Sequence, residues 1–416
     1  MRKLIKITVL FLIINSTLNI ENSSCQWVQV PNGMGNNKSV SSLAISGDNI
    51  FAAAYSYGVY LSTNNGINWT QTSLNNHHAI SLAVNSSYIF AGVDNNCQNS
   101  SGIYRSANNG LNWIQTSFTE RYIPSLATIG SNVFAGCWGC VYPGGVYLST
   151  DNGSNWSQTS IIDMDVWCLT VSGNNIFTGI AYSPSSLGGV YHSTDNGTSW
   201  SLIGMSNKNA LSIAVSGYNI FVGTHGAGVF LTTNNGMNWT QTSLNNKRVK
   251  SIVISDNNIF AGTETSGVYL STNNGTNWTQ KNQGLDTLNI KSLLLTSNYI
   301  FAGTRGKSVW RRNLSEIIGI NQISEIFPSS YSLSQNYPNP FNSQTTIEFD
   351  IKKKGDYSLV IYDCLGRKRE EVFNEYLNAG SYSVSFNGDE LQSGVYFYRL
   401  SADGNVVDTK KMVLVK

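Results

Sequence analysis

The sequence has 416 residues, of which 41% are hydrophobic and 12% are charged, and it contains only 7 prolines. This length allows two or three domains with sizeable cores, and the composition excludes a collagen-like chain and a charge-driven disordered one. The formal net charge is only +2. Bulk charge therefore gives no reason to expect nucleic acid or an anionic membrane as a partner.

Residues 1–25 have the pattern of a secretory signal peptide. Basic residues precede the apolar run 7–14, which is too short to span a bilayer, and small residues offer a cleavage site at Ser23-Ser24-Cys25. Cys25 is alternatively a lipoprotein cysteine, although Asn22 stands where such a motif has Leu. No later stretch reaches the ~18 apolar residues of a membrane span. We therefore predict an exported protein, secreted or on the outer cell surface, with no transmembrane span.

The most informative feature of the chain is an internal repeat. Each unit holds four short runs rich in β-branched and aromatic residues, as at 250–255, 258–263, 267–272 and 277–281. Four strands every ~40 residues, without a helical period, predict an all-β fold built from propeller blades. Seven tryptophans mark the repeat: Trp27, Trp69, Trp113, Trp156, Trp200, Trp239 and Trp278.

The two ends of the repeat region complement each other. The run 26–30 reads as a fourth strand without the preceding three, and 290–312 reads as three strands without a fourth. Pairing the two completes a blade and leaves no open sheet edge. We therefore predict a seven-bladed β-propeller over residues 26–312.

A turn of constant design precedes six of the tryptophans. Gly supplies a positive φ, an Asn or Asp side chain caps the turn, and Trp packs beneath it. The turn resembles the Asp-box (BNR) repeat of sortilin-like and sialidase-like propellers, although the box residue is Asp only at Asp151 and Asp195 and Asn elsewhere. Such boxes also occur in xyloglucan hydrolases and photosystem-assembly propellers, so the resemblance implies a fold and no activity. The copies are Ser62–Trp69, Ser106–Trp113, Ser149–Trp156, Ser193–Trp200, Thr232–Trp239 and Ser271–Trp278.

Variable loops indicate where a ligand would bind. If the run before each Asn-Ile-Phe-Ala-Gly-Thr is innermost, the turns lie on one face of the disc and the variable loops on the other. Aromatic side chains mixed with carboxylates suit stacking on sugar rings or holding an extended peptide, although an ordinary solvated surface has the same composition. Beside Tyr55, the candidate ligand-binding residues are Tyr57, His77, His78, Asp94, Arg121, Tyr122, Trp138, Asp163, Asp165, Trp167, Tyr182, His225, Glu264 and Arg305.

Catalysis is the alternative for the same face. Asp163 and Asp165 are expected on one strand face, about 7 Å apart by strand rise, a spacing that could suit an inverting glycoside hydrolase. Adjacent surface aspartates are nevertheless common. A sialidase-like site needs three converging arginines, and Arg121-Tyr122-Ile123-Pro124 only loosely resembles that family's motif. We therefore expect no catalytic residues, with the aspartate pair as the alternative.

Metal and redox chemistry are not expected. His77 and His78 are consecutive, so on a strand they point to opposite sides. Cys137 and Cys140 have CxxC spacing, but a zinc site would need a second such pair or nearby histidines. Together with Cys97 and Cys168 they are interpreted as loop disulfides or inert thiols, with the pairing left open. We predict no metal and no cofactor.

The amino-acid composition changes after residue 312. Residues 313–330 are interpreted as a polar linker, and in 331–416 alternating strands at 357–362, 381–386 and 395–401 predict a small Ig-like β-sandwich. The blocks 333–342, 347–349, 361–367, 379–382, 393–400 and 410–416 resemble, in order, the type A sorting domain of the type IX secretion system; only Ser343 stands where Pro is usual. Its signature is Gln335, Asn336, Tyr337, Pro338, Asn339, Pro340, Phe341 and Asn342.

The resemblance implies partners as well as a fold. A sorting domain of this type is recognised by the outer-membrane translocon and typically removed by a sortase-like protease, and the cargo is released or attached to surface lipopolysaccharide. We therefore predict a non-catalytic binding module for glycan or protein, delivered to the cell exterior. The alternatives are a polysaccharide-active hydrolase and a structural surface-layer protein without a specific ligand.

Overall fold

The computed structural model describes residues 26–94, 100–119, 121–139, 143–181, 188–255, 258–314, 317, 321–324, 328–377, 379–388 and 391–416. The predicted signal peptide, residues 1–25, lies outside them. The described structure is nearly all β. Within this part of the chain, no helix is long and apolar enough to cross a membrane.

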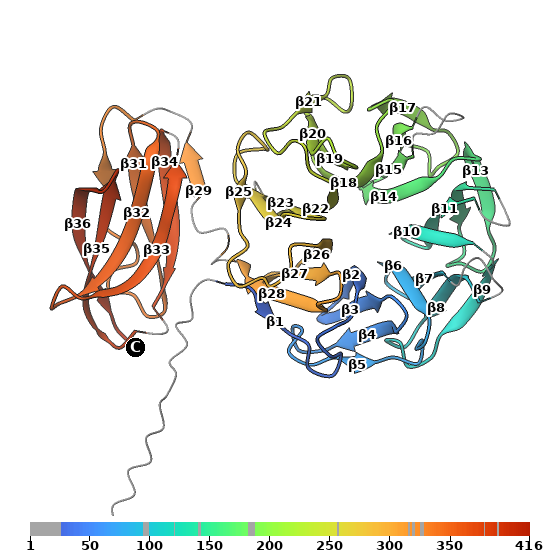
Figure 1. Ribbon diagram of the computed structural model, residues 1–416, viewed down its shortest axis with the longest axis horizontal. Coiled ribbons are helices and arrows are strands. Elements are labelled where there is room, and N and C mark those ends of the chain that lie inside the picture. The colour runs from blue at the N-terminus through green and yellow to red at the C-terminus, as the bar shows by residue number, and fades with distance from the viewer. Residues whose placement is uncertain are drawn as a thin grey trace, which may run out of the picture.

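Four-stranded sheets follow one another around a common axis and resemble a β-propeller (Figure 1). Within the described residues, six such sheets are continuous in sequence and are numbered sheets 1 to 6 from the N-terminus. Their strands, in order from the first to the fourth, are β2 (Val40–Ser46), β3 (Asn49–Ala54), β4 (Gly58–Ser62) and β5 (Thr70–Gln71); β6 (His78–Val84), β7 (Ile89–Asp94), β8 (Gly102–Ser106) and β9 (Ile114–Thr119); β10 (Tyr122–Ile129), β11 (Asn132–Trp138), β12 (Gly145–Ser149) and β13 (Ser157–Ile162); β14 (Val166–Ser172), β15 (Asn175–Ile180), β16 (Gly189–Ser193) and β17 (Ser201–Gly204); β18 (Ala210–Ser216), β19 (Asn219–Thr224), β20 (Val229–Thr232) and β21 (Thr240–Gln241); and β22 (Val249–Ser255), β23 (Asn258–Thr263), β24 (Gly267–Ser271) and β25 (Thr279–Gln280).

A further sheet, sheet 7, joins the two ends of the repeat region. It contains β26 (Ile290–Leu295), β27 (Tyr299–Thr304), β28 (Val309–Asn313) and, at its outer edge, β1 (Val28–Gln29). Strand β1 pairs antiparallel with β28, with Val28 opposite Arg311. The predicted pairing of the first strand with the segment near residue 300 is therefore confirmed, and it closes the ring.

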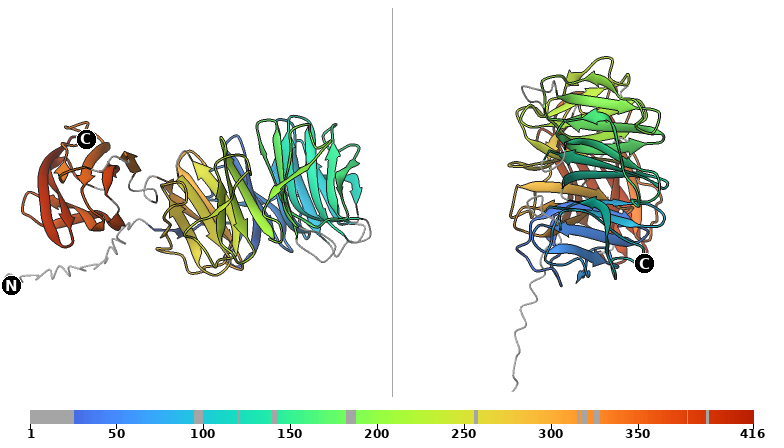
Figure 2. Two further views of the ribbon diagram at one scale, coloured as in Figure 1. Left: turned by 90° about the horizontal axis from the view of Figure 1, so that it is seen from above. Right: turned by 90° about the vertical axis from the view of Figure 1, so that its right-hand side faces the viewer.

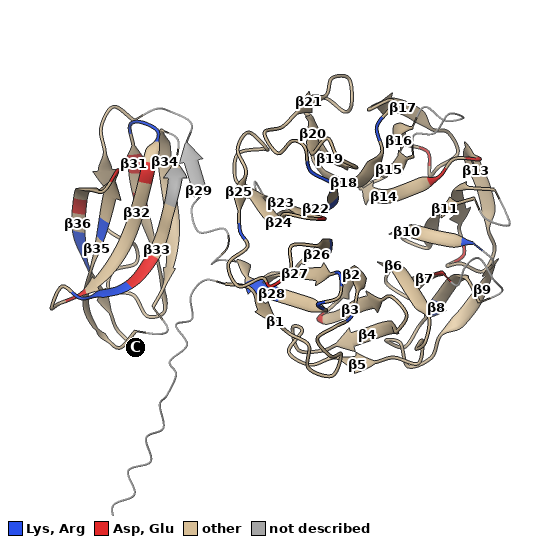
Figure 3. Cartoon of the chain, in the orientation of Figure 1, with Lys and Arg blue, Asp and Glu red and all other residues tan. Residues whose placement is uncertain are grey.

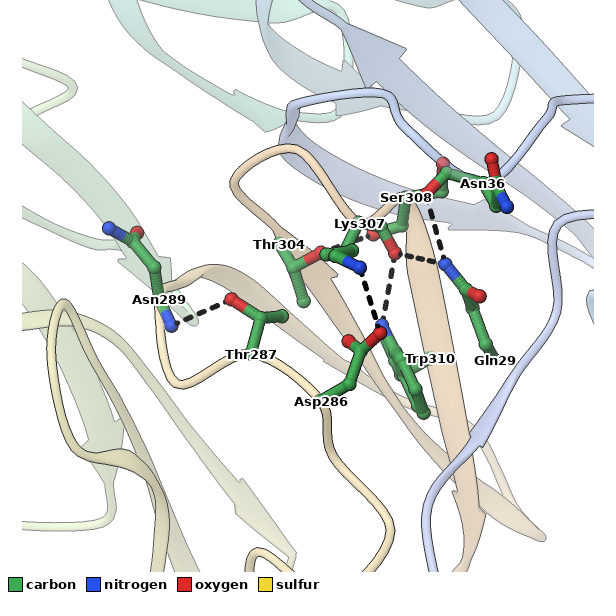
Figure 4. Close-up of polar contacts among 9 residues, drawn as sticks. All are labelled: Gln29, Asn36, Asp286, Thr287, Asn289, Thr304, Lys307, Ser308 and Trp310. Carbon is green, nitrogen blue, oxygen red and sulfur yellow. Dashed lines mark hydrogen bonds and ion pairs between the residues drawn. The ribbon is translucent and has the colours of Figure 1, made fainter.

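Side chains reinforce this closure (Figure 4). The Gln29 side-chain amide donates to the carbonyl oxygens of Asn36 at 3.1 Å and Lys307 at 2.8 Å, and the Trp310 indole N–H also donates to Lys307, at 3.0 Å. Lys307 in turn forms an ion pair with Asp286 at 3.0 Å. The loop between β27 and β28 is thus held from both the first and the last parts of the ring.

The innermost strands touch each other around the axis, and β26 also contacts β2. Apolar side chains fill the space between neighbouring sheets: Phe51 of β3 packs with Leu82 and Ile89 of sheet 2, and both Phe51 and its counterpart Phe90 are fully buried. The second strand of each sheet contributes most of this core because its residues face a sheet on either side. The repeated Ile-Phe-Ala-Gly segment therefore forms the packed framework of the ring.

The turns before the tryptophans have the predicted chemistry. In sheet 1 the Ser62 hydroxyl accepts the Gly66 backbone N–H at 2.9 Å, and the Asn64 side-chain oxygen accepts the Asn68 N–H at 2.9 Å. Gly66 has φ 76°, and a Cβ there would lie 2.7 Å from the Phe301 ring, so this position requires glycine. The hydrogen bonds fix the turn internally, and the close approach of Gly66 to Phe301 packs it against sheet 7.

The C-terminal part contains two further four-stranded sheets. One has the order β29 (Asn321–Ser324), β34 (Gly380–Asn387), β31 (Gln344–Ile351), β30 (Ser332–Leu333), and the other β33 (Lys368–Leu377), β32 (Gly355–Asp363), β35 (Gly394–Ala402), β36 (Asn405–Leu414). Residues of both sheets share one buried core, which includes Ile347, Phe349, Tyr357 and Tyr398. The three strands predicted here are confirmed within β32, β34 and β35. Strand β29 comes from the segment interpreted as a linker, and it pairs with β34.

Candidate ligand-binding face

The two ends of the ring carry different connections, and the edge-on view in Figure 2 shows them on opposite sides. One end, here called the turn face, carries the Ser/Thr-x-Asn/Asp turns between the third and fourth strands. The other end, here called the loop face, carries the loops between the second and third strands and the loops that lead into each innermost strand. The predicted division into a constant and a variable face therefore follows from the strand order.

The sequence-predicted residues that the structure describes lie at strand ends on the loop face. Tyr182 lies outside the described residues. The others are Tyr57 in the β3–β4 loop, His77 and His78 at the start of β6, Asp94 at the end of β7, Arg121 and Tyr122 at the start of β10, Trp138 at the end of β11, Asp163 and Asp165 before β14, Trp167 in β14, and His225, Glu264 and Arg305 directly after β19, β23 and β27.

Five of the aromatic side chains on this face, Tyr55, His78, Tyr122, Trp138 and Trp167, form what we call the aromatic row. The ring centroids of Tyr55 and His78 are 4.5 Å apart. Those of Tyr122 and Trp138 are 4.9 Å apart, and those of Trp138 and Trp167 are 4.3 Å apart. The Trp138 indole N–H donates to the Val166 carbonyl oxygen at 2.8 Å, which fixes its ring. The row extends over sheets 1 to 4.

Asp94 lies beside the middle of the aromatic row. It stands opposite His78 in the β6–β7 ladder and is 9% exposed. The pKa of the Tyr122 hydroxyl is raised to about 12, chiefly by burial, with the neighbouring Asp94 and Tyr55 acting in the same direction. Tyr122 therefore stays protonated at neutral pH and can act as a hydrogen-bond donor beside a carboxylate.

The two adjacent histidines have different surroundings. His77 packs edge-on against Tyr104 of its own sheet at 5.3 Å, whereas His78 packs against Tyr55 of sheet 1 at 4.5 Å. This agrees with the expectation that they point to opposite sides. Among the described residues, no group of three or more His, Cys, Asp or Glu is placed to hold a metal ion.

The expectation that Asp163 and Asp165 share one strand face is wrong. Strand β14 begins only at Val166, and Asp163 has φ 56°, a left-handed conformation that Asp tolerates in a tight turn. The Asp165 carboxylate accepts the Gly139 backbone N–H at 3.1 Å and thereby holds the neighbouring loop. Strand rise therefore does not give the separation of the two carboxylates, and the Asp165 carboxylate has a structural role in the loop.

Arg121, which precedes β10, packs between sheets 2 and 3. Its guanidinium carbon lies 4.3 Å from the Phe118 ring centroid and 5.0 Å from that of Tyr147, and a guanidinium N–H donates to the Thr119 carbonyl oxygen at 3.0 Å. Tyr57 is likewise covered from one side, because the Lys38 ammonium lies 3.3 Å from its ring centroid. These contacts stiffen the rim around the aromatic row.

Sequence reasoning missed a group of basic residues near the axis. Arg248, Lys250 and Lys291 lie at the loop-face ends of β22 and β26, close to the predicted residues Glu264 and Arg305. Arg248 and Glu264 form an ion pair at 2.8 Å, and the Lys250 ammonium lies 5.6 Å from the Trp167 ring centroid. Figure 3 shows basic positions at the inner ends of β22 and β26. A signal was present, because Lys250 and Lys291 occupy the same position of the repeat.

The described cysteines are free thiols: Cys137 and Cys168 are buried and Cys364 is exposed. Burial raises the pKa of the Cys168 thiol to about 12 and that of Cys137 as well, so neither is a reactive thiolate at neutral pH. Cys97 and Cys140 lie outside the described residues, so the choice between a disulfide and inert thiols stays open for these two cysteines.

The C-terminal signature residues hold the end of the chain. Asn336 is 2% exposed. Its side-chain amide N–H donates to the Thr345 hydroxyl at 2.8 Å, and its backbone N–H donates to the Tyr398 hydroxyl at 2.7 Å. The Asn339 side-chain oxygen accepts the Val413 N–H at 2.9 Å, while the Tyr337 side chain is 82% exposed. In the same unit, Tyr331, Lys353 and Asp403 line a pocket of about 440 Å³.

Comparison with known proteins agrees with this division. Residues 335–416 match the family model described as the secretion system C-terminal sorting domain. The chain therefore carries a type IX sorting domain, which directs the protein to the cell exterior or cell surface through that secretion machinery. No curated protein matches the chain in sequence.

Solved structures are similar in fold. PorZ of Porphyromonas gingivalis, a surface component of the type IX secretion system, has 17% identity and a TM-score of 0.54 over 92% of this chain and 60% of its own length. YCF48 bound to the D1 peptide has 12% identity and a TM-score of 0.53 over 69% of this chain and 96% of its own. The GH74 xyloglucanase of Xanthomonas campestris has 13% identity and a TM-score of 0.55 over 93% and 67%. At these identities the comparisons establish the β-propeller fold alone, and the chain spans only 60% of the length of PorZ.

Proposed function

We propose that residues 26–312 form a seven-bladed propeller of the Asp-box type, one blade for each of sheets 1 to 7. In this proposal a signal peptide at 1–25 precedes it, and a linker at 313–330 leads to an Ig-like sorting domain at 331–416. The contacts among neighbouring innermost strands and the pairing of β1 with β28 support the closed ring. A sortase-like protease would remove the sorting domain after export.

The proposed activity is non-catalytic binding of a glycan or protein on the loop face. The observation that carries it is the aromatic row, whose rings run over four neighbouring sheets with Asp94 beside them. Partly exposed aromatic rings with a few fixed polar groups suit flat, repetitive ligands such as sugar rings, and also extended peptides. The remaining candidates on this face would line the rim of the same site.

Binding is favoured over hydrolysis by the placement of the carboxylates. A glycoside hydrolase needs two carboxyl groups that flank one bond at a defined separation. The Asp165 carboxylate is engaged by the Gly139 N–H, and Asp163 forms part of a tight turn. The fold likeness to a xyloglucanase adds no catalytic residue to this chain.

A glycan and peptide array probed with the purified protein tests the proposal. We expect a ligand whose affinity falls about tenfold in the double variant Trp138→Ala/Trp167→Ala, because stacking contacts of this kind each contribute about 1 kcal/mol or more. Tyr218→Ala is the matched control, since Tyr218 is 72% exposed on the turn face. Equal loss in both variants, or turnover of a bound glycan that depends on Asp163, would contradict non-catalytic binding on this face.

A further inference from the structure

The first strand of every sheet in the ring contains a bulge at its loop-face end. In each of sheets 1 to 7 the register shifts by one residue, as between Val249 and Ser251 and between Ile290 and Ser292. A bulge leaves one residue out of the ladder and re-aims its side chain. In sheets 1 to 7 the residues at this repeat position are Ser41, Ile80, Pro124, Trp167, Leu211, Lys250 and Lys291.

Two lysines at this position bring positive charge to the axis. Strands β22 and β26 are neighbours, and the Lys250 ammonium reaches the Trp167 ring, which belongs to β14 two sheets away. The side chains at the bulges of different sheets therefore converge. We call Arg248, Lys250, Lys291 and Arg305 the axial basic cluster.

The cluster has too little negative charge of its own. Glu264 is the carboxylate in its midst, and it pairs with Arg248, so four basic side chains face one acidic side chain. Among the residues that the structure describes, Lys250 and Lys291 have no ion-pair partner, and the buried Arg248 Nε has no hydrogen-bond acceptor. Partly buried positive charges without counter-charges are costly, so the arrangement favours an anion.

The electrostatics of the lysines agree with this. The pKa of Lys250 is lowered to about 8, chiefly by burial, with Arg248 and Lys291 acting in the same direction and Glu264 opposing them. Burial also lowers the pKa of Lys291, with Arg305 and Arg248 acting in the same direction. His225 forms an isolated bridge with Arg248 at the edge of the cluster. A bound anion would reverse these shifts.

We propose that the axial basic cluster binds the acidic group of a negatively charged glycan. The inference rests on the proposed function, because Trp167 is both the end of the aromatic row and the ring beside Lys250. A sugar ring that stacks along the row can place its carboxylate or sulfate against Lys250 and Lys291. An acidic peptide without aromatic residues, such as poly-glutamate, supplies the charge but no rings to stack along the row.

Calorimetric titration at low ionic strength tests the proposal with polygalacturonate, alginate, hyaluronate and dextran sulfate. Fully methyl-esterified polygalacturonate supplies the same sugar without charge, and poly-glutamate supplies charge without sugar rings. We expect at least one acidic polysaccharide to bind, and Lys250→Gln/Lys291→Gln to weaken it about tenfold or more. Lys208→Gln removes the same charge from another loop of this face and should have little effect.

The affinity should also fall between about pH 7 and pH 9.5 as Lys250 loses its proton.

Each result supports or overturns the proposal. No binding by any acidic polysaccharide, an equal effect of Lys208→Gln, or equally tight poly-glutamate overturns it. Failure of this proposal is distinguishable from failure of the proposed function: a neutral glycan or a peptide that depends on Trp138 and Trp167 but not on the lysines leaves the proposed function standing. If an acidic polysaccharide binds in a way that depends on the lysines but not on Trp138, the axial basic cluster is a binding site and the aromatic row is not part of it.

Discussion

The two faces of the ring are built from the same strands but follow different rules. On the turn face, the backbone N–H of a glycine donates to a Ser or Thr hydroxyl six times, at 2.8–3.0 Å each, in sheets 1 to 6. On the loop face, equivalent positions carry Ser, Ile, Pro, Trp, Leu and Lys. The repeated turn sequence stabilises the fold, whereas the residues that differ between sheets on the loop face are those that can bind a ligand.

The largest expected effect comes from breaking the turn face. Trp69 is 3% exposed, and its indole N–H donates to the Val30 carbonyl oxygen at 2.9 Å. Trp69→Ala should destabilise the ring by ~3–5 kcal/mol, because it leaves a cavity and an unpaired carbonyl. Denaturant unfolding measures this loss, while the ligand affinity of the folded protein should stay unchanged.

Trp138→Ala is the matched substitution on the loop face. It should weaken ligand binding with a much smaller loss of stability, since Trp138 is only half-buried. If both tryptophans affect stability and binding to the same degree, the functional division between the faces is wrong.

A smaller effect is expected from a single turn hydroxyl. Ser193 is 2% exposed, accepts the Gly197 N–H at 2.9 Å and donates to Asp195 at 2.8 Å. Ser193→Ala leaves the N–H without its partner and should cost ~1–3 kcal/mol in unfolding experiments. Ser193→Thr should restore most of it, because Thr232 makes the same bonds in sheet 5. Equal destabilisation by Ala and Thr would show that packing and not the hydrogen bond matters.

The same contrast explains what the sequence predicts well and what it does not. The turns and the Trp and Phe positions recur in nearly every repeat, so their structure follows from local chemistry and was predicted together with the ring closure. The conformation of Asp163 depends on the loop that follows β13, and the other repeats do not share this loop, so the repeat pattern could not predict it. Lys250 and Lys291 were missed because they lie inside strands, and only the bulge turns them toward the axis.

Removing a lysine from the loop face should slightly stabilise the ring. The pKa of Lys250 in the folded protein, about 8, lies below its usual value. At a pH between the folded and the unfolded pKa, the unfolded chain therefore binds more protons than the folded protein. The stability of the wild-type protein should therefore rise with pH in this window, and Lys250→Met should abolish that part of the rise. After allowance for solvent screening the difference is at most about 1 kcal/mol. It is measured as the change in stability of each protein between about pH 7.5 and pH 9.5. An identical pH dependence in both proteins would contradict a desolvated Lys250.

The smallest effect is expected from the two charged turns. Hydrogen bonds from Asn155 to Asp151, and from Ser199 to Asp195, lower the pKa of each carboxyl to about 2. Since the folded pKa lies below the unfolded value, this stabilisation is present above about pH 4 and is lost as the pH falls toward 2. Asp151→Asn/Asp195→Asn should change stability little near neutral pH, because the other four turns already use Asn. The double variant should lose less stability than the wild-type protein between pH 4 and 2 in acid titrations followed by circular dichroism. If it loses as much, carboxylates elsewhere, such as Asp363 beside Arg367 and Arg369 in the sorting domain, control the acid response.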